Sequence, residues 1–473
     1  MDYTLKLGLG SGHYTGTAIP AGPNALPYSA TSRWHPGFSN VTLNGTAVAT
    51  ASDLTGLANL TQTDPGAQPE AMTDGAGAPF WRIGSGAWMN VGTGLVASTR
   101  NITVLLVARV PNIGSTNALF GLGNVAAGTQ VNTLGATMQL KQYNNDAGYL
   151  YAASLPPRNA YTIPGAQKQV LVVNCTATGT LCGINDQSAT SSSLVHGVSG
   201  IAGAELGRYP NSTGLKGTFD LYEAVVFSPA LSDTQAMEVS QSLMAAHGIA
   251  SIDSQLVLEG DSITSGTGDV TAFLSCAAVL TDPGTSHIPG NWRVVKMGKS
   301  GNTISHLIDR RDGTGGGSWT SRMLPGGNVM AFEIGRNTWD GTPPSQDVNY
   351  NGIVSYLNTP TNGVLQQGWH VRAMANIAAS AALEGNVLDH RARLRSAQFL
   401  SDTDSGAGGA HDGKVTIVST DLIEHGGTTR FQTSADSGNT SYYAGDNTHP
   451  SVLGAEIRVT GGETPHYGVA WGL

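Results

Sequence analysis

The chain changes character near its midpoint, and this change most constrains how it can fold. The first half is dominated by Gly, Thr, Ser, Asn and Ala, with short apolar runs between turn-forming residues. That pattern is typical of an all-β sandwich. Because 473 residues exceed what one hydrophobic core usually organises, we expect two cores.

The boundary between the two parts is expected at residues 248–254. A helical stretch over residues 232–247 stops there at a glycine, and a new apolar run begins. We therefore predict a sandwich over residues 51–250 and a second domain over residues 251–473. Residues 1–50 are expected to be either part of the sandwich or an attachment element.

Three segments of the first half are clear strand candidates: residues 102–110, 169–174 and 218–227. Alternation in the third places one glutamate among apolar side chains of the same face: Phe219, Leu221, Glu223, Val225 and Phe227. That glutamate therefore needs a partner inside the sandwich or a place near its edge.

A candidate nucleophile follows the first apolar run of the second half. Gly260-Asp261-Ser262 comes directly after Leu256-Val257-Leu258, so a strand would end in a tight turn that exposes the Ser262 hydroxyl. A serine needs a base and a third group that orients the base. His449 and Asp446, in Asp446-Asn447-Thr448-His449-Pro450, fit these roles. The alternative for the second segment is an Asx-turn or a helix cap.

Two intervening segments fit the stabilisation of an oxyanion. Gly301 lies in a glycine-containing turn after Val294-Val295, and Asn337 follows the apolar run Val329-Met330-Ala331-Phe332. A backbone N–H from the first and a side-chain amide from the second are the donors that acyl transfer needs. The alternative is a pair of ordinary strand-to-loop turns.

These four segments, in this order, resemble the blocks of the SGNH hydrolases, also called GDSL-type esterases. Ser262, Gly301, Asn337 and His449 match the four namesake residues, and Asp446 stands in its usual place. Two positions depart from the common pattern, since Ile263 replaces a leucine and Thr338 replaces an aspartate found in many members. The second departure leaves open how Asn337 is supported.

The resemblance implies an α/β/α three-layer domain with a mostly parallel sheet. It also implies ester hydrolysis through an acyl-enzyme, with the backbone N–H groups of Ser262 and Gly301 and the Asn337 amide around the oxyanion. Residues 370–375 and 414–418 are expected to be further strands. Residues 387–400 have helical spacing, and we expect their arginines on a solvated face: Arg391, Arg393 and Arg395.

The first half resembles laminin-G-like and concanavalin-A-like jelly rolls. The resemblance rests on the strand around Phe219 with the Ser228-Pro229-Ala230-Leu231-Ser232 segment after it, and on Trp81-Arg82-Ile83 upstream. Such domains often bind glycans, because an aromatic ring packs against the C–H face of a sugar. The candidates by residue type are Trp34, Trp81, Trp88 and Tyr209. A core position for these rings, and a purely structural sandwich, are the alternatives.

The family motifs select the reaction and leave the substrate open. Loops rich in Gly, Ser, Thr, Asn and Asp, at 264–269, 312–318 and 337–344, favour a polar alcohol and a small acyl group. We therefore expect an O-acetylesterase acting on an acetylated polysaccharide, with Arg336 and Trp339 as candidate substrate-binding residues. The alternatives are a general carboxylesterase or lipase with a passive sandwich, and a phage tail adhesin with a glycan-binding sandwich.

The charge pattern excludes several classes of partner. A net charge of −9 with only 12% charged residues supplies no basic patch for nucleic acid or anionic lipid. No apolar stretch approaches the roughly 18 residues of a membrane span. The N-terminus lacks the pattern of a secretory signal. Together with 63 glycines, this favours an extracellular or virion protein, such as a phage tail component that forms a homotrimer or binds other virion proteins.

Cysteines and histidines indicate no metal site and no cofactor. Cys175 and Cys182 flank a six-residue segment that reads as a hairpin loop, where either a disulfide or two free thiols would fit, and Cys276 is expected in a helix core. No His-x-x-x-His, His-Glu-x-x-His or Cys-x-x-Cys pattern occurs.

Overall fold

The computed structural model describes most of the chain in two compact units. The first unit ends at Ile252 and the second begins at Asp253, and of the described residues before that boundary only Thr162 groups with the second. The described residues are 23–84, 86–91, 101–110, 117–123, 137–142, 148–152, 161–162, 167–176, 179–192, 203–208, 217–265, 280, 288, 291–313, 323–338, 343–377, 381–443 and 449–460.

The first unit is built on a curled antiparallel sheet. Its main path runs β11-β10-β9-β16-β7-β4-β3-β5-β6-β17-β8-β13-β14-β15, with β1 paired to β17 and β2 to β3. The strands are β1 (Ser32–Trp34), β2 (Val41–Asn44), β3 (Ala47–Ala51), β4 (Leu60–Thr61), β5 (Glu70–Thr73), β6 (Pro79–Ile83), β7 (Met89–Val91), β8 (Ile102–Arg109), β9 (Asn117–Gly123), β10 (Thr137–Gln142), β11 (Gly148–Ala152), β13 (Gln169–Cys175), β14 (Thr180–Ile184), β15 (Gln187–Ser192), β16 (Gly203–Leu206) and β17 (Phe219–Phe227). A 3-10 turn, η1 (Pro65–Ala67), lies in the same unit. The expected all-β class is confirmed.

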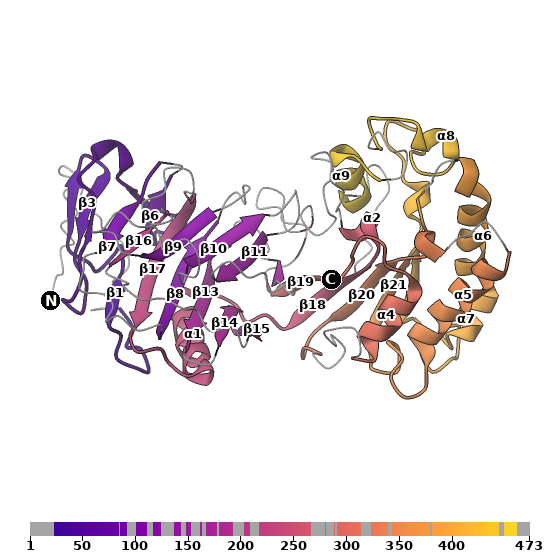
Figure 1. Ribbon diagram of the computed structural model, residues 1–473, viewed down its shortest axis with the longest axis horizontal. Helices are drawn as coiled ribbons and strands as arrows, with labels where there is room; N and C mark the ends of the chain where they lie inside the picture. Colours follow the sequence, from indigo (N-terminus) through magenta and orange to yellow (C-terminus); the bar gives the residue numbers. More distant parts are fainter. Residues whose placement is uncertain are drawn as a thin grey trace. The chain divides into compact units, whose positions relative to one another are not determined.

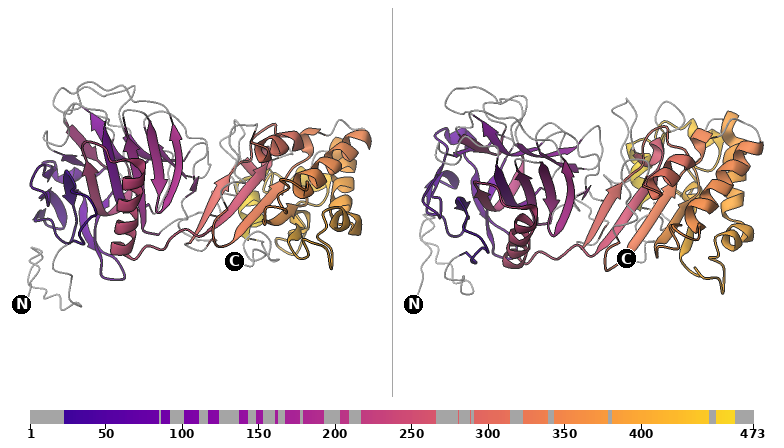
Figure 2. Two further views of the ribbon diagram at one scale, coloured as in Figure 1. Left: turned by 90° about the horizontal axis from the view of Figure 1, so that it is seen from below. Right: turned by 60° about the horizontal axis from the view of Figure 1, so that its bottom comes forward.

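Helix α1 (Asp233–His247) covers part of this sheet. Ser232 caps it with a capping box, and Gly248 ends it in the left-handed conformation (φ 62°). Its apolar side packs against β8, β13 and β17 (Figure 2). The shared core contains Leu105, Val107, Val170, Val172, Val225, Phe227, Ala236, Val239, Leu243 and Met244.

Strand β17 departs from the strict alternation expected for it. A register shift between Leu221 and Glu223 inserts Tyr222, which joins Val225 in the core under α1. Glu223 is buried and has partners there, because Arg33 donates to one carboxylate oxygen and His247 contacts the other at 2.7 Å. Burial raises the pKa of Glu223, but the contacts with His247 and Arg33 outweigh it and hold that pKa below its usual value.

The second unit is an α/β domain on a parallel sheet. The short strand β12 (Tyr161–Thr162) lies at one edge of its sheet, followed by five strands in the order β19-β18-β20-β21-β22, and every neighbouring pair among these five is parallel. They are β18 (Ser254–Gly260), β19 (Trp292–Lys296), β20 (Asn328–Glu333), β21 (His370–Met374) and β22 (Val415–Val418), and Figure 1 shows β18, β20 and β21 side by side. This confirms the expected α/β class with a parallel sheet.

Helices pack on both faces of that sheet. On one face, Tyr356 of α5 meets Phe332 edge-on with ring centroids 6.3 Å apart. On the other, Ala455 of α9 joins Val329 and Ala331 in one core cluster. The helices are α2 (Ser262–Ser265), α4 (Ile304–Arg311), α5 (Pro343–Asn358), α6 (Glu384–Leu394), α7 (Ala397–Asp402), α8 (Ser434–Ser437) and α9 (Val452–Thr460), with 3-10 turns η2 (Arg336–Thr338), η3 (Ala381–Leu383) and η4 (Thr420–Leu422).

The arginine-bearing helix differs from its prediction in two ways. It is divided at Ser396, whose side chain caps α7, so α6 and α7 replace the single expected helix. Arg391 is also not solvated: it is 2% exposed and donates to the backbone carbonyls of Asn376, Phe431 and Gln432. Buried loop carbonyls need hydrogen-bond donors from the protein because water does not reach them, and an arginine side chain offers five N–H donors.

Other buried residues settle alternatives that the sequence left open. Cys175 and Cys182 are free and buried, and their register partners in the β13–β14 pair are Thr180 and Val173. Trp34 and Trp81 are at most 1% exposed, so their rings belong to the core. Among the described helices, none combines the length and the apolar character needed to cross a membrane.

Candidate active site

The predicted site residues come from the carboxyl edge of the parallel sheet. The first strand of the unit, β18, lies between the second, β19, and the third, β20, so the strand order reverses at β18. In open α/β sheets this switch point forms a crevice at the carboxyl ends of the strands. Ser262 follows β18 and Asn337 follows β20, so both come from the two strands that border the crevice.

Gly260 lets the serine turn pack close to the sheet. It has a φ of 146°, and a Cβ there would lie 2.3 Å from Thr264 Oγ1 and 2.4 Å from the Glu333 carbonyl oxygen. No residue with a side chain fits that space without displacing α2 or β20. The absence of a side chain at Gly260 thus allows the start of α2, and with it Ser262, to pack against the strand ends.

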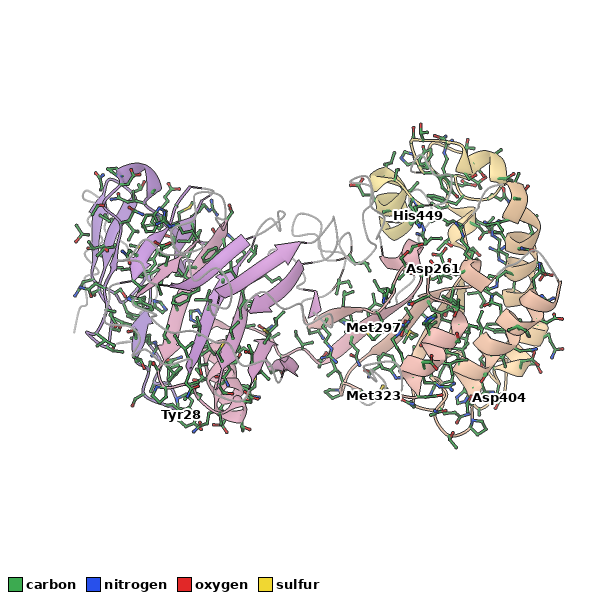
Figure 3. The ribbon with its side chains drawn as sticks, in the orientation of Figure 1. Tyr28, Asp261, Met297, Met323, Asp404 and His449 are labelled. Carbon is green, nitrogen blue, oxygen red and sulfur yellow. The ribbon has the colours of Figure 1, made fainter. Side chains whose placement is uncertain are left out.

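Ser262 and His449 meet in hydrogen-bonding geometry across 187 residues of chain. His449 Nε2 lies 2.7 Å from Ser262 Oγ, and both side chains are partly exposed. A backbone bridge between Tyr443 and Pro450 and a hydrogen bond from Ser451 N to Tyr442 O (2.9 Å) close the loop that carries the histidine. Figure 3 shows His449 near Asp261, the neighbour of Ser262, with Asp404 toward the other end of the unit.

Asn302 connects the segments expected to form the oxyanion site. It is 3% exposed, its amide donates to Gly260 O at 2.9 Å, and its own carbonyl accepts from Asn337 Nδ2 at 2.9 Å. An amide nitrogen carries two hydrogens, so this contact orients the Asn337 amide and uses only one of them. Gly301, with a φ of 79°, turns the same loop, and Gly301 and Asn337 are both exposed. The backbone of Asn302 therefore provides a support for Asn337, which the sequence had left open at Thr338.

Asp261 is a buried acid beside the serine. Burial raises its pKa to about 6, the charge of Glu333 adds to the rise, and the Ile263 N–H, Arg336 and His449 oppose it. The Ile263 N–H donates to its carboxylate at 3.0 Å. This carboxyl group is thus a structural part of the turn, with a pKa raised to about 6.

Behind the turn, two buried arginines accompany Glu333. Arg458 of α9 donates to Glu333 Oε2, and the two side chains are at most 1% exposed. Arg336 is 8% exposed and donates to the carbonyl of Ile377, while the Ile377 N–H donates to Glu333 Oε1 at 3.3 Å. Sequence reasoning missed Glu333 and Arg458. The sequence did contain one indication of a buried charge: Arg458 comes three residues after Ala455, on the apolar side of the last helix.

The catalytic and binding roles predicted for the site residues all remain predictions. Asp446 and Trp339 lie outside the described residues. The substrate role of Arg336 is untested, and its guanidinium has the buried contact with Ile377 described above.

One group of His and acidic side chains in the described part of the chain lies close enough to share a cation. The ligand atoms of His35, Glu223 and His247 lie within 4.8 Å of one another. However, His35 Nδ1 accepts a hydrogen bond from Gly37 N at 2.9 Å, which places the proton of a neutral ring on Nε2. Because Arg33 also binds Glu223, this group is better explained as a hydrogen-bonded cluster that satisfies a buried carboxylate.

Comparisons with known proteins give only distant likenesses. No protein-family model and no curated protein matches the sequence. Among solved structures, domain 4 of AbnA, an extracellular arabinanase from Geobacillus stearothermophilus, bound to arabinotriose, is 18% identical with a TM-score of 0.34, over 45% of this chain and 98% of that one. A GDSL-like lipase from Parabacteroides merdae is 14% identical with a TM-score of 0.31, over 44% of this chain and 94% of that one.

A third likeness is to the Trypanosoma rangeli sialidase, at 11% identity and a TM-score of 0.31, over 46% of this chain. The match spans only 33% of the sialidase. None of these likenesses assigns an activity.

Proposed function

We propose that the protein is a serine ester hydrolase whose nucleophile is Ser262. The observation that carries this proposal is the 2.7 Å contact between Ser262 Oγ and His449 Nε2, at the switch point of a parallel sheet. A serine hydroxyl becomes a useful nucleophile when a base within this distance accepts its proton. The oriented amide of Asn337 and the turn at Gly301 add donors on the same edge.

The reaction proceeds in two halves. Ser262 Oγ attacks the ester carbonyl while its proton passes to His449 Nε2, and the resulting oxyanion is held by the backbone N–H groups of Ser262 and Gly301 and by the Asn337 amide. The tetrahedral species expels the alcohol, which takes the proton from His449. Water then attacks the acyl-enzyme, gives its proton to His449, and releases the acid and the serine. Asp446 orients the histidine in this proposal.

The preferred substrate is an acetyl ester on a polysaccharide. Gly301 and Asn337 are exposed, so the site is open to solvent beside its proposed oxyanion donors, and the neighbouring loops at 264–269 and 337–344 are polar in sequence. An open polar site suits a bulky hydroxylated alcohol with a small acyl group. The first unit would then hold the glycan, in an extracellular or virion setting.

The decisive test is ester hydrolysis by matched variants. Ser262→Ala and His449→Ala should each abolish hydrolysis of a small chromogenic acetyl ester. The controls are Ser305→Ala on the exposed side of α4 and His370→Ala, exposed at the start of β21 on the opposite edge of the sheet. Turnover retained in either test variant, with both controls active, would refute the assignment.

Substrate class is tested separately. Acetate release is measured from a panel of acetylated bacterial and plant polysaccharides, and acyl-chain preference from esters of two to twelve carbons. A rate peak beyond about eight carbons, with no acetate from any polysaccharide, would favour a general carboxylesterase or lipase. No hydrolysis of any ester would favour the adhesin.

A further inference from the structure

We propose that the buried ion pair between Glu333 and Arg458 positions His449 against Ser262. The two residues are positioning residues, since they act through the elements that carry the serine and the histidine. The inference rests on the proposed function for its catalytic consequence. The effect of the ion pair on the distance between Ser262 and His449 does not depend on the proposed function.

Glu333 is fixed to the strand that carries the serine. It is the last residue of β20 and lies opposite Gly260 in the parallel register with β18. A Cβ on Gly260 would lie 2.4 Å from the Glu333 carbonyl oxygen, so the end of β20 and the serine turn are in close backbone contact. The Glu333 carboxylate also accepts from Ile377 N, so it is held by the chain beyond β21 as well.

Arg458 is fixed to the element that carries the histidine. Helix α9 begins at Val452, three residues after His449, and Arg458 lies within it with 0% exposure. At a rise of about 1.5 Å per residue, the backbone of Arg458 lies roughly 9 Å along the helix axis from Val452. Any rotation or translation of α9 would therefore move His449 with it.

The start of α9 is packed too tightly to absorb such a movement locally. A Cβ on Gly454 would lie 2.1 Å from Tyr442 O, so helix and loop are in backbone contact there. Ser451 ties the same turn by donating to Ser441 O at 2.6 Å and accepting from Gly454 N at 3.1 Å. The histidine loop and α9 consequently behave as one piece, whose placement depends on what holds the helix.

An ion pair suits this task because it is directional. Apolar contacts between α9 and the sheet, such as Ala455 on Val329, favour contact without fixing rotation about the helix axis. Arg458 donates one charge-assisted hydrogen bond to the buried Glu333 carboxylate, and such a bond is directional. A lysine ammonium carries its donors on a differently shaped head group and does not place one at the same point. Neither charge is stable alone in this interior, so each requires the other in place.

The experiment compares Arg458→Lys with Arg311→Lys. Arg311 is also buried (6% exposed) in this unit, but it donates to Ser355 O at 2.7 Å and Tyr356 O at 3.2 Å, at the end of α5. Since α5 leads into β21, that contact lies at the edge opposite the site. Both variants should melt at lower temperature than the wild type. At a temperature where circular dichroism shows both folded, only Arg458→Lys should lose function.

Two readouts decide the outcome. In Arg458→Lys, kcat for a chromogenic acetyl ester should fall about tenfold or more with KM within about twofold of wild type, because the ester still binds and proton transfer is misaligned. In crystals of the variant, the distance from Ser262 Oγ to His449 Nε2 should lengthen beyond hydrogen-bonding range, about 3.5 Å. Arg311→Lys should keep both wild-type values.

An unchanged kcat and an unchanged Ser262–His449 distance in folded Arg458→Lys would overturn the proposal, as would an equal loss in Arg311→Lys. If Arg458→Lys does not fold, Glu333→Gln, which keeps the arginine and the shape of the glutamate, takes its place with the same expected and refuting results. A wild-type protein that hydrolyses no ester would refute the proposed function instead. The crystallographic distance would still decide the positioning role.

Discussion

Replacing Asp261 by asparagine should change how the stability of the second unit depends on pH. Burial raises the pKa of this 2%-exposed carboxyl group from 3.8 to about 6, so the folded state binds its proton more tightly than the unfolded state does. Its contribution to stability is therefore fully present below about pH 4 and is lost as the pH rises through about 6. A difference of about 2 in pKa, at about 1.36 kcal/mol each, makes that loss about 3 kcal/mol.

Asparagine removes the titration and keeps an oxygen that can accept from the Ile263 N–H. The free energy of unfolding of Asp261→Asn, minus that of wild type, should rise by about 3 kcal/mol between about pH 3.5 and about pH 7.5. Peptide-resolved hydrogen exchange in urea on the full chain would measure it, following amides of β20 so that the second unit is read separately. Asp309→Asn, on the exposed side of α4, controls for loss of an acidic group.

The two proteins can also differ in free energy of unfolding by an amount that is the same at every pH. That constant part reflects the altered hydrogen bond to the Ile263 N–H, and the test depends only on how the difference changes with pH. A difference that stays constant across the pH range would refute the argument that Asp261 is destabilised by burial. A difference that falls with rising pH would show that the opposing effects of the Ile263 N–H, Arg336 and His449 outweigh the burial.

Two further changes test the backbone and the oxyanion site. Gly260→Ala should destabilise the second unit by about 2 kcal/mol or more, seen as a lower melting temperature, because its Cβ would collide with the Glu333 carbonyl. The control is Gly45→Ala, which is also at positive φ but has open space around the Cβ and should destabilise the protein less. An equal loss of stability in both variants would contradict the steric argument. Asn337→Ala should lower kcat for an acetyl ester by about 10²–10³-fold with little change in KM, because one oxyanion donor is lost; a change confined to KM would exclude that role.

Much of the second unit could be predicted because its signals are local. Apolar runs that end in glycine turns marked β18 and β20. In the first unit, Ser232 and Gly248 marked the ends of α1 in the same way. The structure of residues 387–400 was harder to predict from the sequence, because both the break at Ser396 and the burial of Arg391 depend on partners elsewhere in the chain. Those partners are loop carbonyls at residues 376 and 431–432, to which nothing in the local sequence points.

The first unit illustrates the same limit. Alternation predicted strand β17, but a bulge at Tyr222 altered which residues share the core face. Such a bulge is set by the register with β8, and register depends on pairing rather than on the strand alone. The partners of Glu223 likewise come from residues 190 positions before it and 24 after it, Arg33 and His247.

The sequence by itself determined the two fold classes and the candidate nucleophile, base and oxyanion donors, because glycine turns after apolar runs and the order of the motifs are properties of the chain. Only the tertiary structure decided that Ser262 and His449 come within 2.7 Å, that Asn302 orients Asn337, and that Glu333 pairs with Arg458 behind the turn. The physical reason is that burial and hydrogen bonding join groups far apart along the chain. Their distances follow from how β18, β20 and α9 pack, which no short segment encodes.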